Sequence, residues 1–252
     1  TDADRKTRLL FGNENIPFST VEAYKSFRTA LSFVISTYDS RIVAMTSANP
    51  SEGKSVTVAN LAVAVAQTDK KVLLIDVDMR KPVQHKCFRL SNKVGLSDVI
   101  TGDKSLDKAL NRNVTGSLDV LTSGTIPPNP SELLASRQMK ELLETLKERY
   151  DMILIDCAPI NVVSDVAGLS QEIAGVVMVV HYGSTTYPEL DDAVNRLALA
   201  NCNVLGFAVN EVSSKHGSGY YSNYKYKYKY KYDYQYGSAK QAEEKKKAGS
   251  AC

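Results

Sequence analysis

The stretch Arg41-Ile-Val-Ala-Met-Thr-Ser-Ala-Asn-Pro-Ser-Glu-Gly-Lys-Ser55 decides the fold of this chain. Its apolar run from Ile42 to Met45 predicts a strand, and the apolar spacing that follows Lys54 predicts a helix. The loop between them directs backbone N–H groups and the positive end of the helix at one point, which suits a polyphosphate. The loop fits the pattern G-x-x-x-x-G-K-[ST] except at its first position, where Ala48 replaces glycine. An ordinary turn is the alternative, but the strand and the helix both lie where phosphate binding requires them.

Composition fits one globular α/β domain with a tail, since the chain has 252 residues and 43% of them are hydrophobic. No apolar run approaches the ~20 residues of a membrane span, and residues 1–8 are too polar for a signal peptide. We therefore expect a cytoplasmic protein. The four cysteines lack C-x-x-C spacing, which argues against a disulfide framework or a structural metal.

The rest of the chain alternates helical and strand patterns, which predicts a parallel sheet covered on both faces by helices. A capping-box pattern at Ser19 to Glu22 predicts the start of the first helix. The predicted helices are residues 20–37, 54–66, 130–149 and 188–201, with possible short helices that start at Pro82 and span 95–100. The predicted strands are 42–45, 71–76, 118–121, 151–156, 175–180 and 204–209. We expect the strand at 71–76 to be buried on both faces, and the last two strands to be buried as well.

Acidic residues follow two of the predicted strands. Asp76 and Asp78 come at the end of the strand at 71–76, and Asp156 ends the strand at 151–156. The carboxyl ends of parallel strands meet at one edge of a sheet, where ligands bind, so these acids should lie beside the phosphate loop and its metal. Plain turn formation is the alternative, and the coincidence of two acids with Arg80 disfavours it.

Charged residues also recur every three positions on the predicted helix at 20–37, at Glu22, Lys25 and Arg28. Spacing alone favours a solvated helix face. A surface that pairs with another molecule is the alternative.

The last 42 residues differ from the rest of the chain. Residues 211–252 carry nine Lys and four acids, so the net charge of this segment is about +5. The whole chain has a net charge of +3, so residues 1–210 carry about −2. Nine of the fourteen tyrosines lie there: Tyr220, Tyr221, Tyr224, Tyr226, Tyr228, Tyr230, Tyr232, Tyr234 and Tyr236. With no core to cover, this segment is expected to be disordered or weakly ordered. It could stack on single-stranded nucleic acid, add an edge strand to an assembly, or accept phosphate on its tyrosines, each phosphate adding about −1.5 to −2 charge.

Together with the nucleotide loop and the tyrosine cluster, the motifs Leu74–Arg80, Pro127–Leu133 and Ile155–Pro159 give the chain a likeness to a known family. It resembles the bacterial tyrosine kinases, most of all the cytosolic kinase subunit of capsule and exopolysaccharide systems. The resemblance implies a P-loop NTPase fold akin to the cell-division and chromosome-positioning ATPases. It also implies an N-terminal extension at 1–18, a kinase domain at 19–212 and a flexible tail at 213–252.

The resemblance further implies a role for each matched position. Asp76 is expected to take the tyrosine hydroxyl proton and Asp78 to serve the metal, or the reverse, and Asn210 matches a contact to adenine. Lys54 and Arg80 complete the catalytic set. The expected Mg²⁺ ligands are Ser55, Asp78 and Asp156. The expected ATP-binding loop comprises Pro50, Ser51, Glu52, Gly53, Lys54, Ser55 and Val56.

The chain departs from the family pattern at several positions. Ser51 stands where glycine is usual, Val56 where threonine is common, and Ala158 where the family has proline. Glu22, Lys25 and Arg28 match the E-x-x-R-x-x-R pattern of the family, and that pattern implies ring-like self-association. Lys25 departs from it, because the family has arginine there. The resemblance implies other partners too: the cytoplasmic end of a transmembrane adaptor, which recruits the protein to the inner face of the membrane, and a phosphotyrosine phosphatase. No specific nucleic acid is expected.

Our hypothesis is an ATP- and Mg²⁺-dependent tyrosine autokinase that phosphorylates its own tail, mainly between subunits, and so regulates polysaccharide synthesis and export. A positioning ATPase of the partition and septum-site type, with a tail that binds membrane or nucleic acid, is the alternative. Such ATPases usually carry another lysine early in the phosphate loop, and residues 46–50 have none. A nucleotide-gated scaffold is a third, non-enzymatic possibility.

Overall fold

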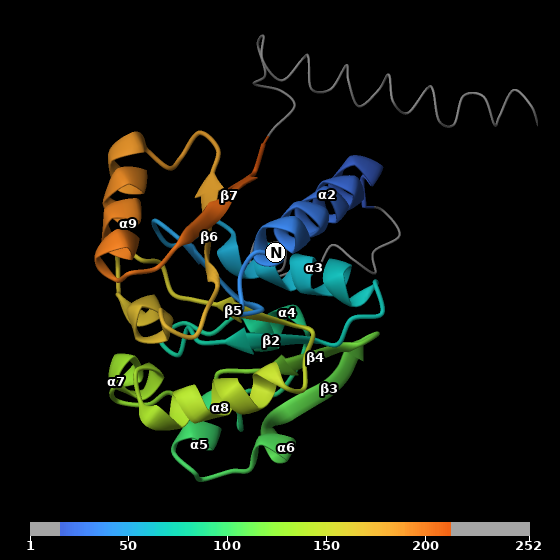
Figure 1. Ribbon diagram of the computed structural model, residues 1–252, viewed down its shortest axis with the longest axis vertical. Coiled ribbons are helices and arrows are strands. Elements are labelled where there is room, and N and C mark those ends of the chain that lie inside the picture. Colours follow the sequence, from blue (N-terminus) through green and yellow to red (C-terminus); the bar gives the residue numbers. More distant parts are fainter. Residues whose placement is uncertain (1–15, 213–252) are drawn as a thin grey trace, which may run out of the picture. The chain divides into compact units, whose positions relative to one another are not determined.

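A seven-stranded sheet forms the centre of the computed structural model, which describes residues 16–212 (Figure 1). The strand order is β3-β4-β2-β5-β1-β6-β7, and every neighbouring pair is parallel except β3 and β4. The strands are β1 (Ile42–Ser47), β2 (Val72–Asp76), β3 (Leu110–Thr115), β4 (Leu118–Leu121), β5 (Met152–Asp156), β6 (Gly175–His181) and β7 (Val204–Asn210). The predicted tail, with all nine of its tyrosines, lies outside the described residues.

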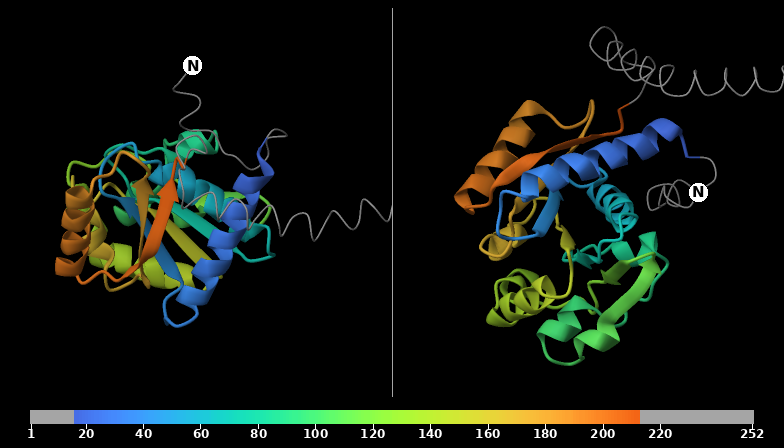
Figure 2. Two further views of the ribbon diagram at one scale, coloured as in Figure 1. Left: turned by 90° about the horizontal axis from the view of Figure 1, so that it is seen from above. Right: turned by 45° about the vertical axis from the view of Figure 1, so that its right-hand side comes forward.

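Helices cover both faces of this sheet, as predicted (Figure 2). Two long ones, α2 (Phe18–Ile35) and α3 (Lys54–Ala66), lie on one face. The others are α4 (Gln84–Cys87), α5 (Leu96–Ile100), α6 (Leu106–Ala109), α7 (Pro130–Leu134), α8 (Arg137–Lys147), α9 (Tyr187–Leu199) and the 3-10 helix η1 (Asp165–Leu169). None of the helices within residues 16–212 combines the length and the apolar character needed to cross a bilayer.

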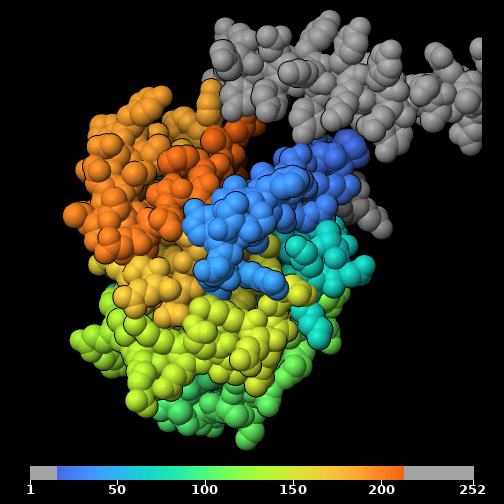
Figure 3. Space-filling view, in the orientation of Figure 1, coloured from blue at the N-terminus to red at the C-terminus, as the bar shows by residue number. Residues whose placement is uncertain are grey.

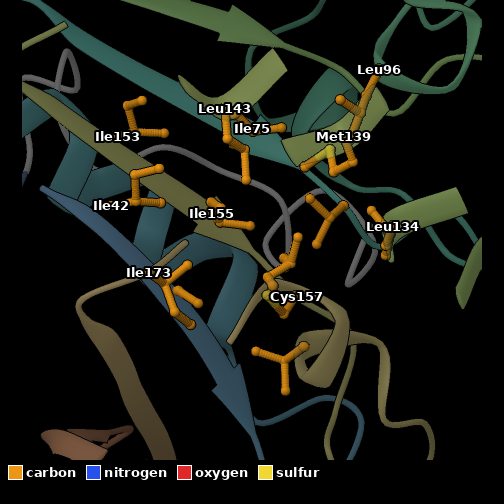
Figure 4. Close-up of a cluster of buried hydrophobic side chains, with 14 of the residues drawn as sticks. Ile42, Ile75, Leu96, Leu134, Met139, Leu143, Ile153, Ile155, Cys157 and Ile173 are labelled. Atoms are coloured by element: carbon orange, nitrogen blue, oxygen red, sulfur yellow. The ribbon is translucent and has the colours of Figure 1, made fainter. Parts of the chain in front are cut away.

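The inner strands are apolar on both faces because each face packs under helices. Every residue of β1, β2 and β5 is buried. Along β1, Ile42 joins the core under α8 and α9, whereas its neighbour Val43 joins the core under α2 and α3. Figure 4 shows the first of these cores, in which strand residues such as Ile155 meet Leu143 of α8. Alternate residues of an inner strand thus serve the two cores on opposite faces of the sheet.

Strand register brings the acidic ends together. In the β2 and β5 pair, Asp76 lies directly opposite Asp156, and in the β1 and β5 pair, Met45 lies opposite Asp156. The loop that leaves β1 and the acids that end β2 and β5 therefore share one edge of the sheet. The predicted P-loop α/β architecture is confirmed.

Two predictions about helix ends were wrong. The first helix begins at Phe18 with Pro17 as its N-cap, and no side chain caps it, so the capping box expected at Ser19 does not form. The helix expected at 130–149 is two helices, α7 and α8. Ser136 between them is extended, with ψ 158°, and its hydroxyl accepts a hydrogen bond from the Met139 N–H at 3.2 Å, which starts α8.

The two edges of the sheet also differ from expectation. Strand β3 was not predicted, because its sequence is largely polar, and it pairs antiparallel with β4. Strand β7 was expected to be buried, but Phe207 is 52% exposed and Val209 50% exposed. As an edge strand, β7 lies beside α2 on the surface in Figure 3 and has no partner on its outer side among the described residues.

The packing of α3 yields a stability prediction. Leu61 in this helix is fully buried, so Leu61→Ala should lower the free energy of unfolding by ~2–5 kcal/mol through the cavity it leaves. Leu199 at the end of α9 is 86% exposed, so the same substitution there should change it by less than about 0.5 kcal/mol. Urea denaturation followed by circular dichroism measures both, and equal effects would contradict the assignment of α3 to the core.

Candidate active site

Hydrogen bonds within the loop between β1 and α3 fix its conformation. The Ser47 hydroxyl donates to the Asn49 carbonyl at 2.8 Å, and the Asn49 N–H donates to Glu52 Oε2 at 3.1 Å. Gly53, with φ +88°, is the N-cap of α3. The first N–H groups of a helix have no partner within the helix, so this loop offers them to an anion.

Residues of the predicted ATP-binding loop differ in exposure. Pro50 and Ser51 are exposed at its tip and Val56 is half-buried, whereas Glu52 and Ser55 are buried. Ser51 adopts φ +69°, which costs a non-glycine residue about 1–2 kcal/mol. Because Ser51 stands where the family has glycine, this positive φ places local strain on the backbone of the loop.

Lys54 lies at the centre of the site. Its Nζ is 3.2 Å from Asp78 Oδ2, 3.2 Å from Asp156 Oδ1 and 3.1 Å from Ser55 Oγ. Burial by itself would lower the pKa of the lysine, but the charges of Asp156 and Asp78 outweigh it and raise that pKa. The site therefore holds a protonated ammonium group between two carboxylates.

Asp76 has a different environment from Asp78. It is fully buried, and its oxygens accept from the Asp78 N–H at 3.2 Å, the Val83 N–H at 3.0 Å and the Gln84 N–H at 2.9 Å. Burial, followed by the charge of Asp156, raises the pKa of Asp76 to about 8 despite these donors. Asp76 thus fixes the backbone of the segment after β2 through three N–H groups, whereas Asp78, like Asp156, lies against Lys54.

Arg80 is held by two residues that the sequence did not single out. Its Nη2 donates to Ser131 Oγ at 3.0 Å, and its Nε is 3.5 Å from Asp165 Oδ2. The Ser131 hydroxyl in turn donates to Asp165 Oδ1 at 2.5 Å. Ser131 belongs to the quoted motif at 127–133, so that motif positions the arginine, whereas nothing in the sequence pointed to Asp165.

Asn210, at the end of β7, contacts the phosphate loop. Its Nδ2 donates to the Glu52 carbonyl at 3.1 Å, and a Cβ built on Gly53 would lie 2.0 Å from that same Nδ2. The Glu52 side chain is tied down as well, because Thr185 Oγ1 donates to its Oε1 at 2.6 Å. The structure thus brings Asn210 to the loop and adds Thr185, which the sequence gave no reason to choose.

The three charged residues of the stripe on α2 contact groups within the chain. Lys25 pairs with Glu22 at 2.8 Å along the helix, and both side chains are partly exposed. Arg28 Nη1 donates to the Ala64 carbonyl near the end of α3 at 2.8 Å. The stripe therefore lies apart from the acids of the site and links α2 to α3.

The donor set fits Mg²⁺. Ser55, Asp78 and Asp156 offer a hydroxyl and two carboxylates, and Mg²⁺ prefers one or two carboxylates together with substrate phosphates. The ammonium of Lys54, which touches all three side chains, now balances their charge. These three residues could hold a Mg²⁺ ion that arrives with a nucleotide.

A parallel sheet with this loop and these acids defines the class of P-loop nucleotide-binding domains, and a family model described as an AAA domain matches residues 40–185. Tyrosine-protein kinase YwqD of Bacillus subtilis is 44% identical over 202 residues, which cover 79% of this chain and 85% of that protein. Tyrosine-protein kinase etk of Escherichia coli K12 is 36% identical over 235 residues, which cover 86% of this chain and 32% of that protein.

Solved structures agree. The kinase domain of Escherichia coli ETK matches with a TM-score of 0.75 and 35% identity over 82% of this chain and 85% of that one. The septum site-determining protein MinD of Pyrococcus horikoshii, at 24% identity and TM-score 0.57 over 70% of this chain and 73% of that one, shares the fold alone. The chain belongs to the bacterial tyrosine-protein kinase family. It spans about a third of the length of Etk.

Substitution of the central lysine tests the site. Lys54→Met should weaken binding of a fluorescent ATP analogue in the presence of Mg²⁺ by roughly 100-fold, because it removes charge-assisted contacts and leaves Asp78 and Asp156 without their cation. Lys104, between α5 and α6, is exposed and makes no ion pair among those of residues 16–212, so Lys104→Met is the matched control and should bind like the wild type. Similar affinities for both variants would contradict a nucleotide site at Lys54.

A glycine pair tests the contact with Asn210. Gly53 and Gly102 both have positive φ, +88° and +83°, but only at Gly53 would an added Cβ meet another residue. Each Gly→Ala substitution should cost about 1–2 kcal/mol of stability through backbone strain. Only Gly53→Ala should also displace Asn210 and weaken nucleotide binding, by about tenfold. Equal nucleotide affinities of the two variants, measured by the same fluorescence titration, would show that the contact is not needed.

Proposed function

We propose that the chain is an ATP- and Mg²⁺-dependent protein tyrosine kinase that phosphorylates its own C-terminal tyrosine cluster, mainly between subunits. The observation that carries this proposal is the set of contacts that Lys54 makes with Asp78, Asp156 and Ser55 in a member of the tyrosine-protein kinase family. A buried cation stabilises the negative charge of a transferring phosphoryl group. The acids at the ends of the parallel strands can hold Mg²⁺ and accept the tyrosine proton.

Each element of the site has a task in this proposal. The loop from Pro50 to Val56 binds the triphosphate through its N–H groups, and Asn210 contacts the adenine. Lys54 leaves its two carboxylates to pair with the β- and γ-phosphates. Bound Mg²⁺, held by Ser55, Asp78 and Asp156, would neutralise charge on the phosphate oxygens.

The reaction forms a bond between the tyrosine oxygen and the γ-phosphorus while the bond from that phosphorus to the ADP oxygen breaks. The phenol proton passes to a carboxylate. Since free tyrosine has a pKa near 10, the carboxylate helps mainly by orienting the hydroxyl and by taking the proton late. Asp76 and Asp78 are the candidates, and both oxygens of each are already engaged: those of Asp76 accept backbone N–H groups, and those of Asp78 accept from the Lys81 N–H at 3.0 Å and from Lys54 Nζ at 3.2 Å.

Arg80 is proposed to bind negative charge as it moves toward the tyrosine. Its guanidinium is fixed by Ser131 and Asp165, yet the side chain stays 43% exposed, so part of it is open to a substrate. A guanidinium held in this way loses little side-chain entropy when it binds an oxyanion.

The proposed substrate is the tyrosine cluster at 220–236, which holds nine of the fourteen tyrosines of the chain. Lysines alternate with tyrosines from 225 to 231, so several phosphates would reverse the charge of the segment. Any contact that depends on its positive charge would then be lost.

Assembly and context complete the proposal. Glu22 and Lys25 are partly exposed on α2 and available to a neighbouring subunit, which supports a ring-like homo-oligomer. By resemblance, the cytoplasmic end of a transmembrane adaptor activates the kinase and recruits it to the inner face of the membrane. A phosphotyrosine phosphatase reverses the reaction, and the system controls capsular or exopolysaccharide synthesis.

The direct test is incubation of the protein with ATP, Mg²⁺ and an adaptor peptide, followed by mass-spectrometric mapping of phosphotyrosine. We expect modification within 220–236, and none for Lys54→Met alone. If transfer occurs between subunits, wild-type protein should phosphorylate the tail of Lys54→Met when the two are mixed. ATP-driven dimerisation without any phosphotyrosine would instead indicate a positioning ATPase.

A further inference from the structure

Gln84 touches all three acidic and nucleotide-binding segments of the site. It is the first residue of α4 and is fully buried. Its side-chain Nε2 donates to Asp156 Oδ2 at 2.7 Å and to the Ser55 carbonyl at 3.0 Å. Its backbone N–H donates to Asp76 Oδ2 at 2.9 Å. One residue thus joins α3, the segment after β2 and the end of β5.

These partners fix the orientation of the Gln84 amide. A primary amide carries two N–H donors on one side and an acceptor oxygen on the other. Both partners of Nε2, the Ser55 carbonyl and Asp156 Oδ2, are acceptors, so a flipped amide would set oxygen against oxygen. The amide keeps this orientation although its Oε1 is buried without a hydrogen-bond partner in the described part of the chain.

The orientation of Asp156 follows from that of Gln84. Oδ1 of Asp156 faces Lys54 Nζ at 3.2 Å, and Oδ2 faces Gln84 Nε2 at 2.7 Å. Two donors on different oxygens fix the plane of a carboxylate. Without the amide, only the Lys54 contact would hold it, and that lysine is the group a triphosphate would draw away.

We propose that Gln84 is a positioning residue that holds the Asp156 carboxylate and the first turn of α3 in the relative position that binds a Mg²⁺-nucleotide. Through the Ser55 carbonyl it fixes the residue whose hydroxyl belongs to the donor set, and through Oδ2 it leaves Oδ1 of Asp156 turned toward the nucleotide. The inference rests on the proposed function only in that the site takes a Mg²⁺-nucleotide.

The test compares Mg²⁺ dependence in two variants of matched chemistry. Gln84→Met keeps the side-chain length and removes both donors. It should raise the Mg²⁺ concentration for half-maximal binding of fluorescent ADP by roughly 10- to 100-fold, the range found when a partner that orients a metal ligand is lost. Affinity for the same nucleotide in EDTA should change less than about twofold. Gln138 lies exposed on α8, so Gln138→Met is the control and should leave the Mg²⁺ dependence unchanged.

A second variant guards against loss of folding. Gln84→Asn keeps the amide but is one methylene too short to reach Ser55 and Asp156 together, so it should shift the Mg²⁺ dependence in the same direction. Thermal denaturation is recorded for every variant. A lowered melting temperature with wild-type Mg²⁺ dependence would overturn the proposal and leave Gln84 as a purely structural residue, as would a wild-type protein whose nucleotide binding ignores Mg²⁺.

Failure of the kinase assignment would look different. Wild-type protein that binds nucleotide with Mg²⁺ dependence but yields no phosphotyrosine would contradict the proposed function. The shift caused by Gln84→Met would still decide the role of Gln84 in that case.

Discussion

The burial of the Lys54 ammonium among carboxylates is the constraint on which the rest of the site depends. A charged group taken out of water requires partners at close range, and the charges of Asp156 and Asp78 outweigh the effect of burial and raise the pKa of the lysine. The sheet register brings these acids to the lysine, since Asp76, two residues before Asp78, lies opposite Asp156, and β1 runs beside β5 toward the same edge. The strand pairing of the sheet and the ion pairs of Lys54 therefore depend on the same strand ends.

Much of this arrangement could be predicted from the sequence, because it follows from strand direction alone. An apolar run that ends in Asp places that acid at the carboxyl edge of a parallel sheet, and this holds for Asp76 and Asp156 without knowledge of any contact. Gln84, Thr185 and Asp165 could not be found in the same way. Their roles arise from hydrogen bonds between segments 29 to 133 residues apart, which leave no periodic signal.

The errors in the fold have local physical causes. A helical pattern of leucines continues through 130–149, but one serine hydroxyl that accepts from an N–H three residues on is enough to end one helix and start another. The apolar sequence of β7 describes a strand that fits under helices, yet its place at the sheet edge leaves Phe207 and Val209 half-exposed. Sequence pattern reports which residues can be buried, and topology decides which of them are.

Asn210 ends β7 and also contacts the phosphate loop, so the point where the chain leaves the sheet is mechanically coupled to the nucleotide site. Its backbone carbonyl accepts from the Tyr182 N–H at 3.0 Å, and its side chain donates to the Glu52 carbonyl at 3.1 Å. A pulling force applied beyond residue 210 would be divided between the pairing of β7 with β6 and this side-chain contact. Such a force would therefore also load the loop between β1 and α3.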